Sequence, residues 1–89
     1  MKIVVTIVGE DKVGIIAMVS QALAEHNVNI LNINQNILDG FFNMVMIADM
    51  SQAVISLKDL NQLLKDKGEA MGLVIKVQHE DIFQAMHQI

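Results

Sequence analysis

Runs of β-branched residues and helix-periodic stretches follow one another along the first third of the chain. Residues 3–8, IVVTIV, are rich in β-branched side chains and end at Gly9, which predicts a strand that is buried on both faces. Residues 9–14 are typical of a turn. Apolar positions then recur at helical spacing, at Ile16, Val19 and Leu23, with Ile15, Met18 and Ala22 widening the stripe. This stripe predicts an amphipathic helix over residues 14–26, and His26 and Asn27 fit its end.

The middle of the chain has the pattern of a β-hairpin. In residues 28–38, VNILNINQNIL, apolar and amide side chains alternate, which predicts a strand with one apolar and one amide-lined face. The apolar positions are Leu31, Ile33 and Ile37, and the amide positions are Asn32, Asn34 and Asn36. Asp39-Gly40 is a strong signal for a two-residue turn, because a type I′ turn needs positive φ at both positions. Residues 41–50 are apolar on nearly both faces, so we expect the return strand in the centre of the sheet.

The last third of the chain predicts a second helix, a short strand and a terminal helix. Ser56 and Asp59 resemble a capping box, and leucines recur after them at helical spacing, at positions 57, 60, 63 and 64. Gly68 offers an early stop, but the apolar stripe continues, so we expect this helix to end at Met71 with Gly72 behind it. Residues 73–78, LVIKVQ, predict a short strand, and residues 80–88 predict a helix with one apolar side.

The predicted order of elements is β-α-β-β-α-β followed by a helix. This order is typical of the ferredoxin-like arrangement in the α+β class. We therefore expect a four-stranded antiparallel sheet, two helices on one of its faces and a short C-terminal helix, in a single domain over residues 1–89. Because helices cover only one face of such a sheet, Asn34 and Asn36 are expected on a solvated face, the alternative being a ligand seam or a subunit interface.

Composition excludes several classes of protein. Hydrophobic residues make up 53% of the chain, against about 45–50% in an average domain even with glycine counted, so apolar surface is expected to remain for a partner, most simply a second copy. The absence of Cys excludes a disulfide framework and thiolate metal sites. A net charge of −4, with no Arg, Trp or Tyr, argues against a nucleic-acid partner. Apolar runs are far too short to span a membrane or to form a signal peptide, so a cytoplasmic location is expected.

Two short segments resemble the ACT domain, a small ligand-binding module of amino-acid-metabolism enzymes and regulators. They are GEDKVGII at residues 9–16 and HNVNI at residues 26–30. The resemblance covers the whole chain in the order and length of its elements. Small ACT proteins similar to the N-terminal part of formyltetrahydrofolate deformylases and to glycine-cleavage regulators are the nearest in appearance.

The resemblance implies where a ligand binds. ACT domains commonly pair side by side, and a small ligand, usually an amino acid, binds between the first turn of one subunit and the second strand of another. The positions here that match this site are Asp11, Lys12, Val13, Gly14, Ile15, Asn29 and Ile30. Some serine-binding members have a His at the position of Gly9, and its replacement here removes a side-chain donor.

The residues of the first turn also have a chemical interpretation of their own. The free N–H groups at a helix N-terminus attract a carboxylate, and Asp11 is suited to accept bonds from an ammonium group, so the pair fits a zwitterion. The alternative is that Asp11 only caps the helix and Gly14 only serves a tight turn. We expect Asn29 to lie beside this turn. The three His residues form no compact metal-binding spacing, and no catalytic motif or cofactor motif is present.

These observations predict a regulatory domain rather than an enzyme. We expect a domain that binds a small molecule, most simply an amino acid, and that works as a dimer or higher oligomer, acting on a further protein. The alternative is a module that pairs with itself and with a partner protein and binds no small ligand. An enzyme of ferredoxin-like fold is the least favoured of the three interpretations.

Overall fold

The computed structural model describes residues 1–10 and 12–86, which form seven elements in the predicted order. They are β1 (Lys2–Glu10), α1 (Ile15–Glu25), β2 (Asn29–Leu38), β3 (Phe41–Asp49), α2 (Leu57–Ala70), β4 (Val74–His79) and α3 (Glu80–Met86). The bounds of β1 and β4 lie one or two residues from the predicted ones, because the ends of an element are the part that a sequence pattern defines least sharply. The end of the predicted C-terminal helix, residues 87 and 88, lies outside the described residues.

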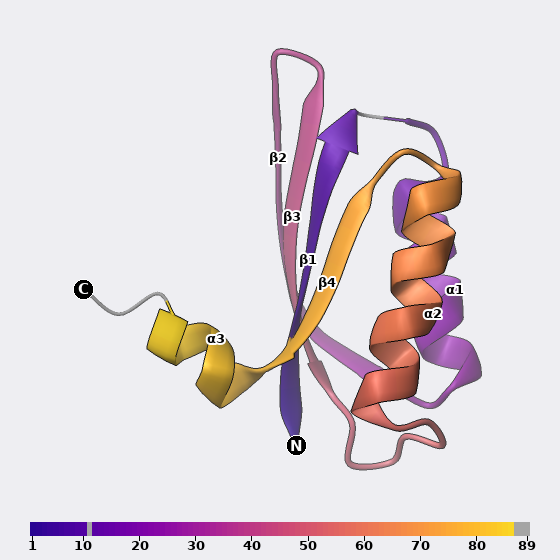
Figure 1. Ribbon diagram of the computed structural model, residues 1–89, viewed down its shortest axis with the longest axis vertical. Helices are drawn as coiled ribbons and strands as arrows, with labels where there is room; N and C mark the ends of the chain where they lie inside the picture. Colours follow the sequence, from indigo (N-terminus) through magenta and orange to yellow (C-terminus); the bar gives the residue numbers. More distant parts are fainter. Residues whose placement is uncertain (11, 87–89) are drawn as a thin grey trace.

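The four strands form one antiparallel sheet in the order β2-β3-β1-β4. The helices α1 and α2 both lie on one face of this sheet, and α3 lies on the other side, at the end of the sheet where β4 finishes (Figure 1). The ferredoxin-like fold is therefore confirmed, as is the central place of β3 between β2 and β1. We call the face covered by α1 and α2 the helix face, and the opposite face the open face.

Alternation along the strands places the core between the sheet and the two helices. In β1, Ile3, Val5 and Ile7 face the helices and are fully buried, beside Met44 and Met46 of β3. The prediction that the first strand is buried on both faces is only half right. On its open face Val4 is 2% exposed but Val8 is 46% exposed, because no helix lies over that end of the open face within the described residues.

A β-bulge changes the alternation of β2. Ile30 pairs with Ala48, but Asn32, and not Leu31, pairs with Ile47. The extra residue lets Ile30 and Ile33 both point to the helix face, although they are three positions apart. Beyond the bulge the predicted alternation is confirmed, since asparagines share the open face. The apolar face of β2 is less well covered than expected, because Ile33 and Ile37 remain 42% and 52% exposed at the edge of the sheet.

The second helix has a glycine, Gly68, in its last turns because the sheet leaves no room for a side chain at that position. The hydroxyl of Ser56 accepts a bond from the Asp59 backbone N–H at 3.1 Å, which caps the helix as predicted. Gly68 is buried, and a Cβ on it would lie 2.7 Å from Cγ1 of Ile75. The helix ends with Met71 as its C-cap and Gly72 at a φ of 73°, which confirms the predicted stop.

Replacement of Gly68 with Ala is expected to destabilise the domain. Ala favours a helix over Gly by about 1 kcal/mol, but the added methyl group meets Ile75, and overpacking of this kind costs about 1–3 kcal/mol. Urea unfolding monitored by circular dichroism measures the difference. Lys67→Ala, at the neighbouring exposed position, is the control and should leave stability nearly unchanged. A Gly68→Ala variant more stable than the wild type would contradict the packing argument.

Candidate ligand-binding site

The first turn of the predicted site connects β1 to α1. Asp11 lies outside the described residues. Lys12, Val13 and Gly14 are exposed, and Val13 has no cover from the described part of the chain. Gly14 is the N-cap of α1 and has a φ of 93°, a conformation that favours glycine. The turn therefore presents backbone groups and a lysine side chain to solvent.

The N-terminus of α1 opens directly onto this turn. The carbonyl of Gly14 accepts the first helical bond from the Met18 N–H at 2.9 Å, so the N–H groups before Met18 have no carbonyl partner within the helix. Gly14 provides no capping side chain, and the first turn of α1 contains no acidic residue. The partial positive charge of this helix end is thus not offset by a carboxylate of α1 itself.

The turn between α2 and β4 lies against the first turn and the end of β1. The Lys12 ammonium nitrogen lies 3.4 Å from the position that a Cβ on Gly72 would take. Gly9, at the end of β1, lies against the same turn, since a Cβ on it would be 2.6 Å from Cδ2 of Leu73 and 3.2 Å from the Gly72 carbonyl oxygen. The glycine at position 9 therefore has a packing reason, and any larger side chain there requires Leu73 to move.

The structure places Asn29 far from the turn, and the expectation that the two lie side by side in one chain is wrong. Asn29 begins β2 and pairs with Asp49, which pairs in turn with Lys2 at the start of β1. Residues 12–14 lie beyond the opposite end of β1, which finishes at Glu10. The 11 residues of α1, about 16 Å of helix, separate the two segments.

Two of the candidate residues have side chains that pack inside the domain. Ile15 is 2% exposed and belongs to the hydrophobic core, and Ile30 is half-buried against it. A ligand contact at these two positions would therefore involve backbone groups. The side chains that remain accessible among the described candidates are those of Lys12, Val13 and Asn29.

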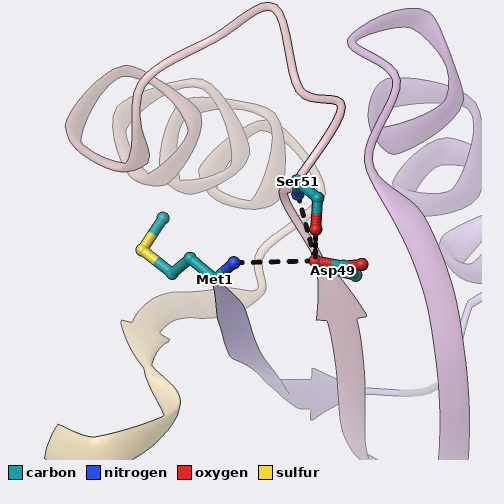
Figure 2. A network of polar contacts seen from close by, with 3 residues as sticks. All are labelled: Met1, Asp49 and Ser51. Carbon is teal, nitrogen blue, oxygen red and sulfur yellow. Dashed lines mark hydrogen bonds and ion pairs between the residues drawn. The ribbon is translucent and has the colours of Figure 1, made fainter.

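A polar network fixes the end of the sheet at which Asn29 lies (Figure 2). One carboxylate oxygen of Asp49 accepts bonds from the Ser51 backbone N–H at 3.0 Å and from the Ser51 hydroxyl, and lies 3.7 Å from the Met1 ammonium nitrogen. The hydrogen bonds from the Ser51 hydroxyl and backbone N–H, followed by the Met1 ammonium, hold the pKa of Asp49 below its ordinary value of 3.8.

The open face carries a hollow where the sequence pattern favours a solvated surface. It has a volume of about 430 Å³ and is lined by Asn32, Asn34, Asn36, Asn43, Val45 and Ile47. Its asparagines come from two neighbouring strands, β2 and β3. The alternation of the sequence indicates the row on β2, but only the register of the hairpin brings Asn43 opposite Asn36.

The described residues hold no group of three metal-ligating side chains. Among them, no helix is long and apolar enough to cross a membrane.

Comparison with known proteins finds a matching family model, related sequences and similar folds. A model of the ACT domain matches residues 1–78. A UPF0237 protein of Clostridium perfringens is 51% identical over 89 residues, which is 100% of both chains. The structure is similar to that of an ACT domain protein from Streptococcus pneumoniae, with a TM-score of 0.81, 36% identity and 98% of each chain covered. A formyltetrahydrofolate deformylase from Pseudomonas syringae shares the fold, with a TM-score of 0.79 and 23% identity, over 88% of this chain and 27% of that one.

The Asp49 network predicts a specific loss of stability in acid. Because folding lowers the pKa of Asp49, its contribution is fully present above the unfolded value, near 3.8, and is lost as the pH falls through the lower folded value. Asp49→Asn should therefore be less stable than the wild type at pH 7, and the difference should shrink below about pH 4. Urea unfolding at pH values from strongly acidic to neutral would measure it, with Ser51→Ala as the variant that removes the hydroxyl donor. Equal pH dependence in wild type and Asp49→Asn would contradict this assignment.

Proposed function

The chain belongs to the ACT domain family, and on that premise we propose that it is a regulatory domain that binds a small zwitterion, of the amino-acid class, between two copies of itself. One observation carries the proposal. The described part of the first matching segment, residues 12–14, and the second segment, Asn29–Ile30, lie at opposite ends of the sheet within one chain, so a site that uses both needs a second chain.

The chemistry of the turn suits a zwitterion. The N–H groups at the start of α1, for which Gly14 offers no capping side chain, and the Lys12 ammonium favour a carboxylate. A carboxylate such as that of Asp11 favours an ammonium group. The Asn29 side chain is exposed and offers both a donor and an acceptor to either end of such a ligand.

The edge of the sheet formed by β2 is suited to the second copy. Within the described sheet β2 pairs only with β3, and its ten residues, NILNINQNIL, contain no charged side chain and no proline. Edge strands usually carry charges or proline that discourage further pairing. The opposite edge is different, because the Asn61 side-chain oxygen accepts the Val77 N–H of β4 at 2.9 Å. Strand addition is therefore favoured at β2.

Antiparallel pairing of two β2 strands brings the two halves of the site together. The end of β2 that carries Leu38 lies at the same end of the sheet as residues 12–14, since Leu38 pairs with Phe41 and Phe41 with Glu10. In an antiparallel pair, Asn29 of the partner subunit approaches this end. A two-fold axis then creates two equal sites, each with the turn of one copy and the strand of the other.

Regulation follows from mass action in this arrangement. A ligand held between two copies stabilises the pair, by about 2.7 kcal/mol at a hundred times its dissociation constant. To control a further protein, the paired form must bind that protein with a different affinity from the unpaired form. In the alternative interpretation, a self-associating module, two copies still pair but no small ligand binds between them.

A thermal-shift screen tests the ligand. The twenty amino acids and a few folate-pathway metabolites are added to the purified chain, and a concentration-dependent rise in Tm is expected for one or two of them. Asp11→Ala and Asn29→Ala should abolish the rise while leaving the oligomeric state unchanged, whereas Asp66→Ala on the exposed side of α2 should retain it. No rise with any compound, from a stable oligomer, would favour the ligand-free module.

The pairing edge is tested by placing a charge on it. Ile37 is 52% exposed at the rim of β2, so Ile37→Lys places a charge against the apolar start of the partner's β2 in the seam, which discourages strand pairing and should halve the molar mass in light scattering. Val54→Lys, in the segment before α2 where Val54 is 70% exposed, makes the same chemical change elsewhere and should leave the mass unaltered. An Ile37→Lys variant with the wild-type mass would exclude this edge.

A further inference from the structure

The open face of the sheet has the properties of a second interface, separate from the β2 edge. We propose that it docks, face to face, on the open face of another copy of this chain, so that side-by-side pairs join into a larger assembly. The docking surface, called here the amide face, consists of Asn32, Asn34, Asn36, Asn43, Val45 and Ile47.

The register of the hairpin builds the amide face as a regular array. Asn32, Asn34 and Asn36 pair with Ile47, Val45 and Asn43 respectively, so three amides stand in a row about 6.8 Å apart over two half-buried apolar side chains. The row is regular because the bulge at Leu31 lies before it. All four asparagine side chains are exposed, and the surface between them is hollowed by about 430 Å³.

The amide face is complementary to itself in charge and in hydrogen bonding. A two-fold interface brings each surface against its own copy, so ionisable groups near the axis face like charges. The amide face has none, in a chain of net charge −4. An asparagine amide has both donor and acceptor groups, so two identical rows are able to satisfy each other across the axis. On the open face the charge of Lys76 lies two strands away, on β4, so a charged protein or anionic ligand finds no counter-charge on the amide face itself.

The available area meets the requirement for a specific interface. The amide face is the β2–β3 half of the open face. The whole open face, four strands about 4.8 Å apart and about eight residues long, has an area of about 500 Å², or about 1,000 Å² for two copies, which is near the lower bound for a specific contact. Apolar side chains extend the surface toward the far end of the sheet, with Val8, Phe41 and Val74 each 46–69% exposed. The helix α3 projects on the same side as the open face, with Ile82 55% exposed, and adds to the area (Figure 1).

Charge placed at the centre of the amide face separates this interface from the β2 edge. Asn34→Glu puts two carboxylates near the two-fold axis and should raise the dissociation constant of face-to-face docking at least about 100-fold. Gln52→Glu, on the exposed turn after β3, introduces the same charge away from both interfaces and serves as the control. Asn36→Glu repeats the test at the next position of the row, and cooperative urea unfolding verifies that each variant is folded.

Sedimentation velocity across protein concentrations measures the outcome. The wild type and Gln52→Glu are expected to form assemblies of four copies. Ile37→Lys and Asn34→Glu should each form assemblies of two copies, and the variant that combines these two substitutions should be a monomer. A wild type of four copies that Asn34→Glu and Asn36→Glu leave intact would overturn the amide-face interface without touching the β2 edge. A wild type of two copies that only Ile37→Lys dissociates would overturn it as well. If Asn34→Glu dissociates the assembly and Ile37→Lys does not, the result would support the amide-face interface and rule out the side-by-side pair on which the proposed function rests.

Discussion

The packing of two helices on only one face of a four-stranded sheet is the constraint on which the rest of this molecule depends. It lets alternate residues of β1 and β3 fill a closed core, with Val5 beside Met46 and Ile7 beside Met44, and no polar side chain is buried among the described residues. The same arrangement leaves most of one face and one edge of the sheet without cover. In so short a chain, the same strands therefore contribute one face to the core and the opposite face to the surface available for interactions.

Most of the fold follows from patterns in the sequence, because period-2 and period-3.6 alternation are direct consequences of which side chains must meet the core. The bulge at Leu31 is the exception among the strands. Alternation alone cannot locate an inserted residue, although the adjacent apolar residues Ile30 and Leu31 interrupt the pattern at that point. The apolar stripe predicts the passage of α2 through Gly68, but its reason, the closeness of Ile75, belongs to the packing of the folded chain.

The candidate site is predictable in its residue types and not in its geometry. The turn at residues 11–14 and the strand start at Asn29 are short, recognisable segments, and a pattern contains no distance between them. Only the register of β1, β3 and β2 shows that they lie at opposite ends of the sheet. The glycine at position 9 is similar, since its contact with Leu73 joins the first turn to the turn before β4, two segments that are far apart in the sequence.

In the proposed assembly, β2 connects ligand binding to oligomerisation. Its first residues, Asn29 and Ile30, contribute to the ligand site, its edge forms the side-by-side seam, and three of its asparagines form half of the amide face. Within one chain, the closely packed core lies between residues 12–14 and Asn29 and keeps the two ends of the sheet apart. Between chains, the same strand takes part in all three contacts, so the free energies of these contacts are coupled. A ligand is therefore expected to act by changing how many copies associate, rather than by changing the shape of a single copy.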